Sequence, residues 1–305
     1  MVKRTMLGAV LLTACALAAA EDGNNLLVFG NADGSARTID VNGRPDPDNA
    51  FFQDLGMNGR RCVTCHQPDS AWSITPDNVQ RRFAASRGAD AIFRNNDGSN
   101  CEGALPQTIA GKRQAYSLLL TRGLIRVALD VPAGAEFVIE RVDDPNRCGP
   151  SSHDASLYRR PLPSTNLKFI TAVMWDGRES SASTSIEQDL LHQANDATRG
   201  HAQAAIDLTP AQAREIVRFE TGLFTAQERD NDAGNLHAGN ARGGAAALRD
   251  QAFFPGINDP VGLDPTGAPF DPKAFSIFDA WRRRDGASGR EAEARAAIAR
   301  GQAIF

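Results

Sequence analysis

The sequence lacks the features that mark several common classes of protein. Basic residues are not in excess, because 33 Lys and Arg stand against 37 Asp and Glu, for a formal net charge of −4. A nucleic-acid-binding surface needs a basic stripe or patch, so we expect no nucleic-acid partner. Aromatic residues make up only 7% of the 305 residues, but 42% are apolar. That fraction is enough for a packed core, which excludes a wholly disordered or low-complexity chain.

Long hydrophobic runs are also missing, and the one at the start is short. Residues 1–20 have the pattern of a signal peptide, in which Lys3 and Arg4 precede an apolar run of fifteen residues ending at Ala20. A spanning helix needs about 20 such residues. Cys15 closes a Leu-Thr-Ala-Cys stretch that resembles the cleavage site of bacterial lipoproteins, where the cysteine is lipid-anchored. Cleavage after Ala20 and cleavage before Cys15 are both left as alternatives, and both predict a periplasmic location.

Cysteine is scarce, and the four cysteines outside the signal form two different pairs. Cys101 and Cys148 lie in polar, loop-like surroundings. Because an exported protein matures in an oxidising compartment, we expect a disulfide between them, with two free thiols as the alternative.

The other pair belongs to the motif Cys62-Val63-Thr64-Cys65-His66, which is the C-x-x-C-H sequence of c-type haem attachment. The two thiols add to the haem vinyl groups and the imidazole ligates the iron. The alternatives are a dithiol redox pair, which would not need the histidine, and a zinc site, which needs a second close ligand pair that is absent. The sequence therefore predicts one covalently attached haem c, with His66 as the metal ligand.

Local patterns predict a mainly α fold with loop-rich insertions and a small β-hairpin. The two strands are expected over 124–131 and 136–142, on either side of a Pro-Ala-Gly-Ala turn. Residues 228–270 are rich in Asn, Asp, Gly and Pro, and we expect a loop or linker there. Helix starts are expected at Thr75-Pro76, Thr209-Pro210 and Ser288, the last with Glu291 as its capping-box partner.

Four stretches together resemble the bacterial dihaem cytochrome c peroxidase family, which includes the dihaem enzyme of methylamine utilisation. The most specific of them is Trp175-Asp176-Gly177-Arg178, downstream of the haem motif. The four stretches are 58–66, 164–178, 208–220 and 301–305.

The resemblance implies a cytochrome c-like haem domain over residues 21–287, which would be the peroxidatic half of such an enzyme. Residues 288–305 would be the first helix of a second cytochrome c domain, missing from this sequence, whose haem supplies electrons. The family's interdomain calcium is not supported, because its asparagine has no match near Arg159-Arg160.

The resemblance also implies roles for single residues. Trp175 would relay electrons between the haems, and Arg178 would pair with a haem propionate or a carboxylate. The family's proton-handling glutamate follows this stretch, but no acid aligns here. The candidates for that role are Glu187, Asp189, His192 and Asp196.

The sequence does not decide what lies at the sixth iron position, which would be permanently open if no side chain occupies it. His153 or His192 could close it, and Met57 or Met174 would suit an electron carrier.

The expected activity is the reduction of hydrogen peroxide by an exported oxidoreductase. Its electron donor would be a small cytochrome or cupredoxin, and homodimer formation is left open. One alternative is a non-catalytic electron-transfer cytochrome. Another is a dihaem oxidase that modifies a partner protein.

Overall fold

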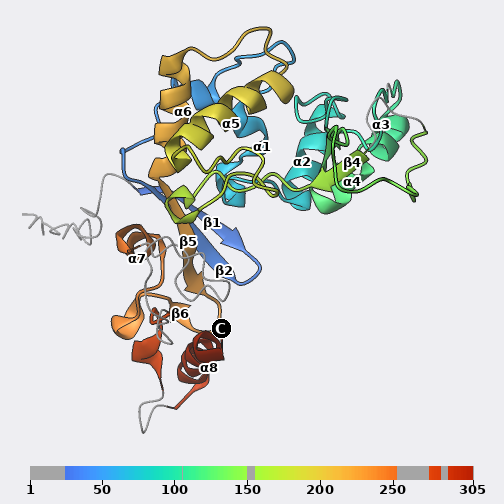
Figure 1. The fold of residues 1–305 in the computed structure, drawn as a ribbon. Helices are drawn as coiled ribbons and strands as arrows, with labels where there is room; N and C mark the ends of the chain where they lie inside the picture. Colours follow the sequence, from blue (N-terminus) through green and yellow to red (C-terminus); the bar gives the residue numbers. More distant parts are fainter. Residues whose placement is uncertain (1–24, 105, 150–154, 253–274, 283–287, 305) are drawn as a thin grey trace, which may run out of the picture.

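The chain is a mixed α/β protein, 38% helical and 14% strand, with an antiparallel sheet. The expected mainly α, cytochrome c-like fold is therefore wrong. The computed structural model describes residues 25–104, 106–149, 155–252, 275–282 and 288–304. Figure 1 shows α1, α5 and α6 above the larger sheet, and β6 and α8 at its other end.

The larger sheet has four antiparallel strands in the order β1-β2-β5-β6. Its central strands carry the buried side chains Ile39 and Phe224, which face each other in register. Part of the segment expected to be loop, 228–270, contributes to this sheet, and residues 253–274 lie outside the described residues. The strands are β1 (Asn25–Asn31), β2 (Gly34–Asp40), β5 (Leu223–Asp230) and β6 (Gly234–Asn235).

A second sheet corrects the expected hairpin. Strand β3 (Ile125–Leu129) forms as predicted, but it pairs with β4 (Ala155–Arg159) rather than with residues 136–142. The apolar residues of 136–142 are largely exposed; Val138, for example, is 82% exposed. The β-branched residues of segment 136–142 therefore predicted a strand that the tertiary packing does not support.

The helix-start signals at two threonines are confirmed. Thr75 accepts a hydrogen bond from Asn78 N at the start of α2, and Thr209 accepts one from Gln212 N at the start of α6. The last helix begins at Arg290, close to the expected Ser288. The α-helices are α1 (Cys62–Cys65), α2 (Pro76–Ser86), α3 (Ile109–Ala115), α4 (Ser117–Arg122), α5 (Ile186–Gly200), α6 (Pro210–Gly222), α7 (Ala245–Asp250) and α8 (Arg290–Ile304). Short 3-10 helices cover Ala50–Phe52, Pro68–Ser70, Leu167–Phe169, Ala238–Asn240 and Asp279–Trp281.

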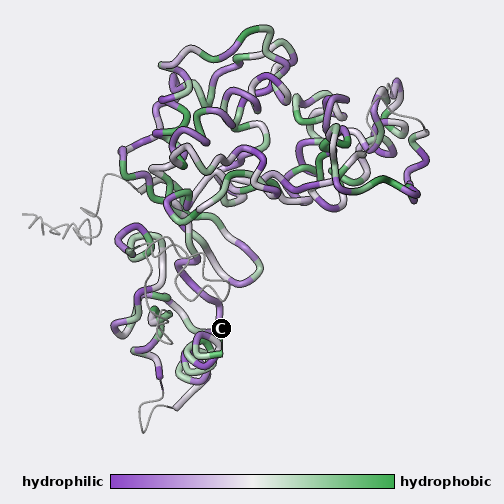
Figure 2. Tube along the Cα trace, in the orientation of Figure 1, coloured by the Kyte–Doolittle hydropathy of each residue, from purple (hydrophilic) through white to green (hydrophobic). Residues whose placement is uncertain are grey.

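The described residues form three apolar clusters. One surrounds Phe51 and Trp72 and includes the inner faces of α5 and α6. A second joins α2, α4 and β3 around Phe83, and a third packs α8 against Trp281. Hydrophilic and hydrophobic residues alternate along the described chain (Figure 2), and none of its helices is long and apolar enough to cross a membrane.

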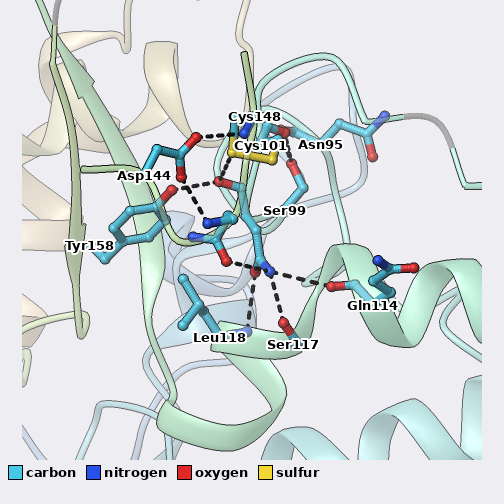
Figure 3. The surroundings of a disulfide bond; sticks show 11 residues. Asn95, Ser99, Cys101, Gln114, Ser117, Leu118, Asp144, Cys148 and Tyr158 are labelled. Atoms are coloured by element: carbon cyan, nitrogen blue, oxygen red, sulfur yellow. Dashed lines mark hydrogen bonds between the residues drawn. A yellow bond between two sulfur atoms is a disulfide. The ribbon is translucent and has the colours of Figure 1, made fainter. Parts of the chain in front are cut away.

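Cys101 and Cys148 form a disulfide, the pairing that the sequence led us to expect. Figure 3 shows the polar network around it. The backbone carbonyl of Asn100 accepts from the Tyr158 hydroxyl at 2.7 Å, and the Asn100 side chain donates to Ser117 Oγ at 2.7 Å. The disulfide therefore joins the 144–148 loop to a network that also includes β4 and α4.

Candidate haem-binding cavity

The haem motif forms a single helical turn at the wall of a cavity. The backbone N–H of Arg61 donates to Thr64 Oγ1 at 2.9 Å, and His66 N–H donates to the Cys62 carbonyl at 3.0 Å. These bonds close the turn at both ends. Residues three apart on a helix share a face, so Cys62 and Cys65 both line the cavity beside His66.

The imidazole of His66 is fixed in one orientation. Its Nδ1 lies 3.0 Å from the Trp72 carbonyl oxygen and 2.9 Å from Ser164 Oγ. A carbonyl can only accept, so Nδ1 carries the ring proton and Nε2 keeps a free lone pair. Burial lowers the pKa of His66 to about 4, so the ring is neutral at pH 7. A neutral imidazole with an anchored N–H is the form that ligates metals.

The Trp72 carbonyl reaches His66 because the backbone is held in an unusual conformation. Ala71 and Trp72 have φ values of 54° and 59°, in the left-handed region that costs about 1–3 kcal/mol for a residue with a side chain. The indole compensates for this cost, since it is only 2% exposed and donates to Thr38 Oγ1 at 3.1 Å. Strand β2, which contains Thr38, thus helps to hold the Trp72 backbone that orients His66.

The cavity has a volume of about 390 Å³ and mainly apolar walls. Strands β3 and β4 supply Ile125, Val127 and Leu157, and α5 supplies Leu190 and Ala194. Cationic groups also line it, which suits the two carboxylates that a haem carries. They are Arg60, Arg61, Arg159, Arg160 and Arg178.

The two thiols do not have the character of a reactive redox pair. Burial raises the pKa of Cys62 strongly and that of Cys65 to about 11. Reactive dithiols have lowered pKa values instead. Among the described residues, the group of side chains placed to surround a metal ion consists of Glu179, His192 and Asp196 and contains neither cysteine. The redox-pair and zinc alternatives therefore find no support at this cavity.

A second histidine, which the sequence analysis did not single out, lines the same cavity. His201 Nδ1 lies 2.6 Å from the buried carboxylate of Asp97. Asp97 also forms a buried ion pair with Arg60, whose side chain is only 3% exposed. Arg60 in turn donates to the carbonyl oxygens of Ala91 and Ile92. The pKa of Asp97 is lowered, because the hydrogen bond from His201 and the charge of Arg60 outweigh its desolvation.

Glu220, on α6, is another cavity residue without a predicted role. It is 7% exposed, and burial raises its pKa to about 7. In the sequence, Glu220 is only the last residue of the family-like stretch 208–220. A mostly apolar helix face that carries one glutamate is the signal that could have identified it.

Besides Cys62, Cys65 and His66, two further predicted site residues lie at this cavity. Trp175 lines it and is a largely exposed residue (59%), and its Nε1 donates to the Arg160 carbonyl at 3.1 Å. Arg178 also lines it and pairs with Asp176 at 3.0 Å.

The predicted proton-handling residues do not line the cavity. Glu187 is exposed, and Asp189 is buried against the Thr184 hydroxyl. His192 is exposed and pairs with Glu179 at 2.6 Å, next to Asp196.

The candidates for the sixth position are divided. His153 lies outside the described residues, and Met57 is 74% exposed. Met174 lines the cavity.

Comparisons of this chain with protein-family models, with curated proteins and with solved structures found no match.

Proposed function

We propose that this protein is a c-type haem oxidoreductase that reduces hydrogen peroxide, with haem attached at Cys62 and Cys65 and ligated by His66. The observation that carries the proposal is the anchored imidazole. Its Nδ1 proton is held by the Trp72 carbonyl and Ser164, which leaves Nε2 for a metal at a cavity that both thiols line. When bound, the haem supplies an iron that transfers electrons to peroxide.

The arginines of the cavity wall would hold the two propionates. Arg60 is committed to Asp97. We assign the propionates to the other cavity arginines, Arg61, Arg159, Arg160 and Arg178, the last of which would exchange its partly exposed pair with Asp176 for a propionate. Arginine suits this role, since its planar guanidinium binds a carboxylate through two parallel hydrogen bonds.

Proton transfer falls to His201 in this proposal. Peroxide cleavage needs a group that takes a proton from one oxygen and returns it to the other. The Nδ1 atom of His201 is held by Asp97, so its Nε2 can accept and release that proton. The Arg60 charge balances Asp97, which keeps the carboxylate in place as an orienting group.

Electrons would enter through Trp175. Its indole lies at the cavity and is also exposed, so it links the interior to the surface. A small cytochrome, a cupredoxin or a second haem domain could donate there.

Electron transfer without catalysis is the second candidate function, and Met174 favours it. A thioether in the cavity wall could occupy the sixth iron position and raise the reduction potential. Such a site would bind neither peroxide nor cyanide.

The test starts with haem attachment. The chain is produced in cells that carry cytochrome c maturation enzymes, beside a double Cys62→Ser, Cys65→Ser variant. Covalent haem should remain on the wild-type chain in a denaturing gel and be absent from the variant. Cyanide should then shift the Soret band, and peroxide turnover should follow with a reduced donor. Haem attachment with no cyanide response would support the electron carrier instead.

Histidine variants then test the proton role. His201→Gln should slow peroxide turnover at least 100-fold. His237→Gln is the matched control, because that exposed side chain lies beside Glu228 and outside the cavity. His192→Gln tests the assignment made from sequence. A large loss there, with His201→Gln unaffected, would overturn our assignment.

A further inference from the structure

A buried carboxyl group lies two hydrogen bonds from the proposed iron ligand. The carboxyl of Glu220 is hydrogen-bonded to the side chain of Ser164. The Ser164 hydroxyl in turn lies 2.9 Å from His66 Nδ1. The backbone N–H of Ser164 donates to the Trp72 carbonyl at 3.0 Å, which fixes the serine against the same loop.

The direction of these hydrogen bonds follows from a count of protons. The proton on His66 Nδ1 is required by the Trp72 carbonyl, so Ser164 Oγ must accept from the ring. The hydroxyl has one proton of its own, and Glu220 is left to receive it. The hydrogen bonds therefore form a row in which the imidazole N–H donates to the serine hydroxyl and the hydroxyl donates to the glutamate carboxylate.

Within the described part of the chain, Glu220 has no basic partner that would explain its burial. No described lysine, arginine or histidine forms an ion pair with it, and Ser164 is the group that lowers its pKa. Asp97 on the same cavity has both Arg60 and His201. Burying an acid without a counter-charge costs folding free energy. The hydrogen-bonded connection to His66 therefore points to a functional role for Glu220.

We propose that Glu220 is a positioning residue that acts through Ser164 on His66 and lowers the reduction potential of the haem site. This inference rests on the proposed haem attachment. A carboxylate at the end of the row pulls the Nδ1 proton toward Ser164, which makes Nε2 a stronger electron donor. A stronger donor favours ferric over ferrous iron, which differ by one electron.

The test compares midpoint potentials of purified holoprotein by spectroelectrochemistry. Glu220→Gln keeps the shape and removes the charge, and it should favour ferrous iron about tenfold, which is 59 mV for one electron. Ser164→Ala should shift the potential in the same direction, and Ser164→Thr, which keeps the hydroxyl, should restore it. The control is Glu215→Gln, an exposed glutamate on the same helix, with no expected shift.

Haem content, measured first, separates the two proposals. A wild-type chain without covalent haem would overturn both. Attached haem with equal potentials in wild type, Glu220→Gln and Ser164→Ala would overturn only the role of Glu220. If Glu220→Gln does not fold, the Ser164→Ala and Ser164→Thr pair decides the question.

Discussion

The indole N–H of Trp72 donates to the hydroxyl of Thr38 over 3.1 Å, at a point where Thr38 is 0% exposed. Thr38 Oγ1 also lies 2.8 Å from Thr225 Oγ1, which lies 3.0 Å from Thr165 Oγ1. This row of hydroxyls joins two strands of the sheet to the cavity wall. Because the Trp72 carbonyl bonds His66, the sheet orients the imidazole.

Thr38→Val should reduce the free energy of unfolding by about 1–3 kcal/mol, because it leaves the buried Trp72 N–H without an acceptor. Urea unfolding followed by tryptophan fluorescence measures the change. Thr38→Ser keeps the hydroxyl and should lose less. A loss in Thr38→Ser as large as that in Thr38→Val would contradict the prediction that the hydrogen bond contributes more than the methyl group at this position.

Asp97→Asn should cost about 3–5 kcal/mol of stability, since it leaves the buried Arg60 charge uncompensated. The matched control is Asp250→Asn, whose partner is Arg249 and whose side chain is 67% exposed. Removing that surface pair should cost under about 1 kcal/mol. Chemical unfolding of both variants provides the comparison, and similar losses would contradict the burial argument.

The disulfide should account for a large share of stability. Replacing Cys101 and Cys148 together by serine opens a loop spanning 47 residues, which should cost about 2–5 kcal/mol. Thermal unfolding of the double variant, with and without reductant, checks this. The wild type should fall to the level of the variant when reductant is added, and a variant as stable as the oxidised wild type would count against the prediction.

Glu220 should make the stability of the haem-free chain depend on pH. Its pKa rises from 4.5 to about 7 on folding, so between these values the folded state binds more protons than the unfolded state. Stability from this group is therefore full below pH 4.5 and is lost as pH rises to 7, by roughly 3 kcal/mol. The measurement is the difference in unfolding free energy between wild type and Glu220→Gln across pH 4–8. A difference that stays constant would refute it.

Local signals in the sequence predicted local structure well. Thr75-Pro76 and Thr209-Pro210 begin α2 and α6 because an N-cap and a proline at N1 act within one turn. The haem motif is local in the same sense, and its five residues do form one turn at a cavity.

Contacts between residues far apart in the sequence could not be predicted from local patterns. Strand β3 was expected to pair with its nearest apolar neighbour, but it pairs with β4 beyond the disulfide loop. His201 forms a hydrogen bond with Asp97, which lies 104 residues earlier in the chain, and no sequence pattern near either residue predicts this contact. The four-stranded sheet was missed for the same reason, because β2 pairs with β5, and the paired residues Thr38 and Thr225 are 187 positions apart. Register between distant strands depends on packing that short periodicities do not report.

Under the proposed haem attachment, the two pairs of described cysteines have opposite redox requirements. Cys101 and Cys148 form a disulfide, so they give up two electrons to an external oxidant, whereas the proposed thioether bonds require Cys62 and Cys65 to stay reduced until haem attaches. Exchange between the pairs needs a thiolate as the attacking group. Burial disfavours the thiolate form of Cys62 and Cys65, so folding slows the attack of these two thiols on the disulfide. A chain that folds before haem attachment would therefore keep Cys62 and Cys65 from forming a disulfide with Cys101 or Cys148.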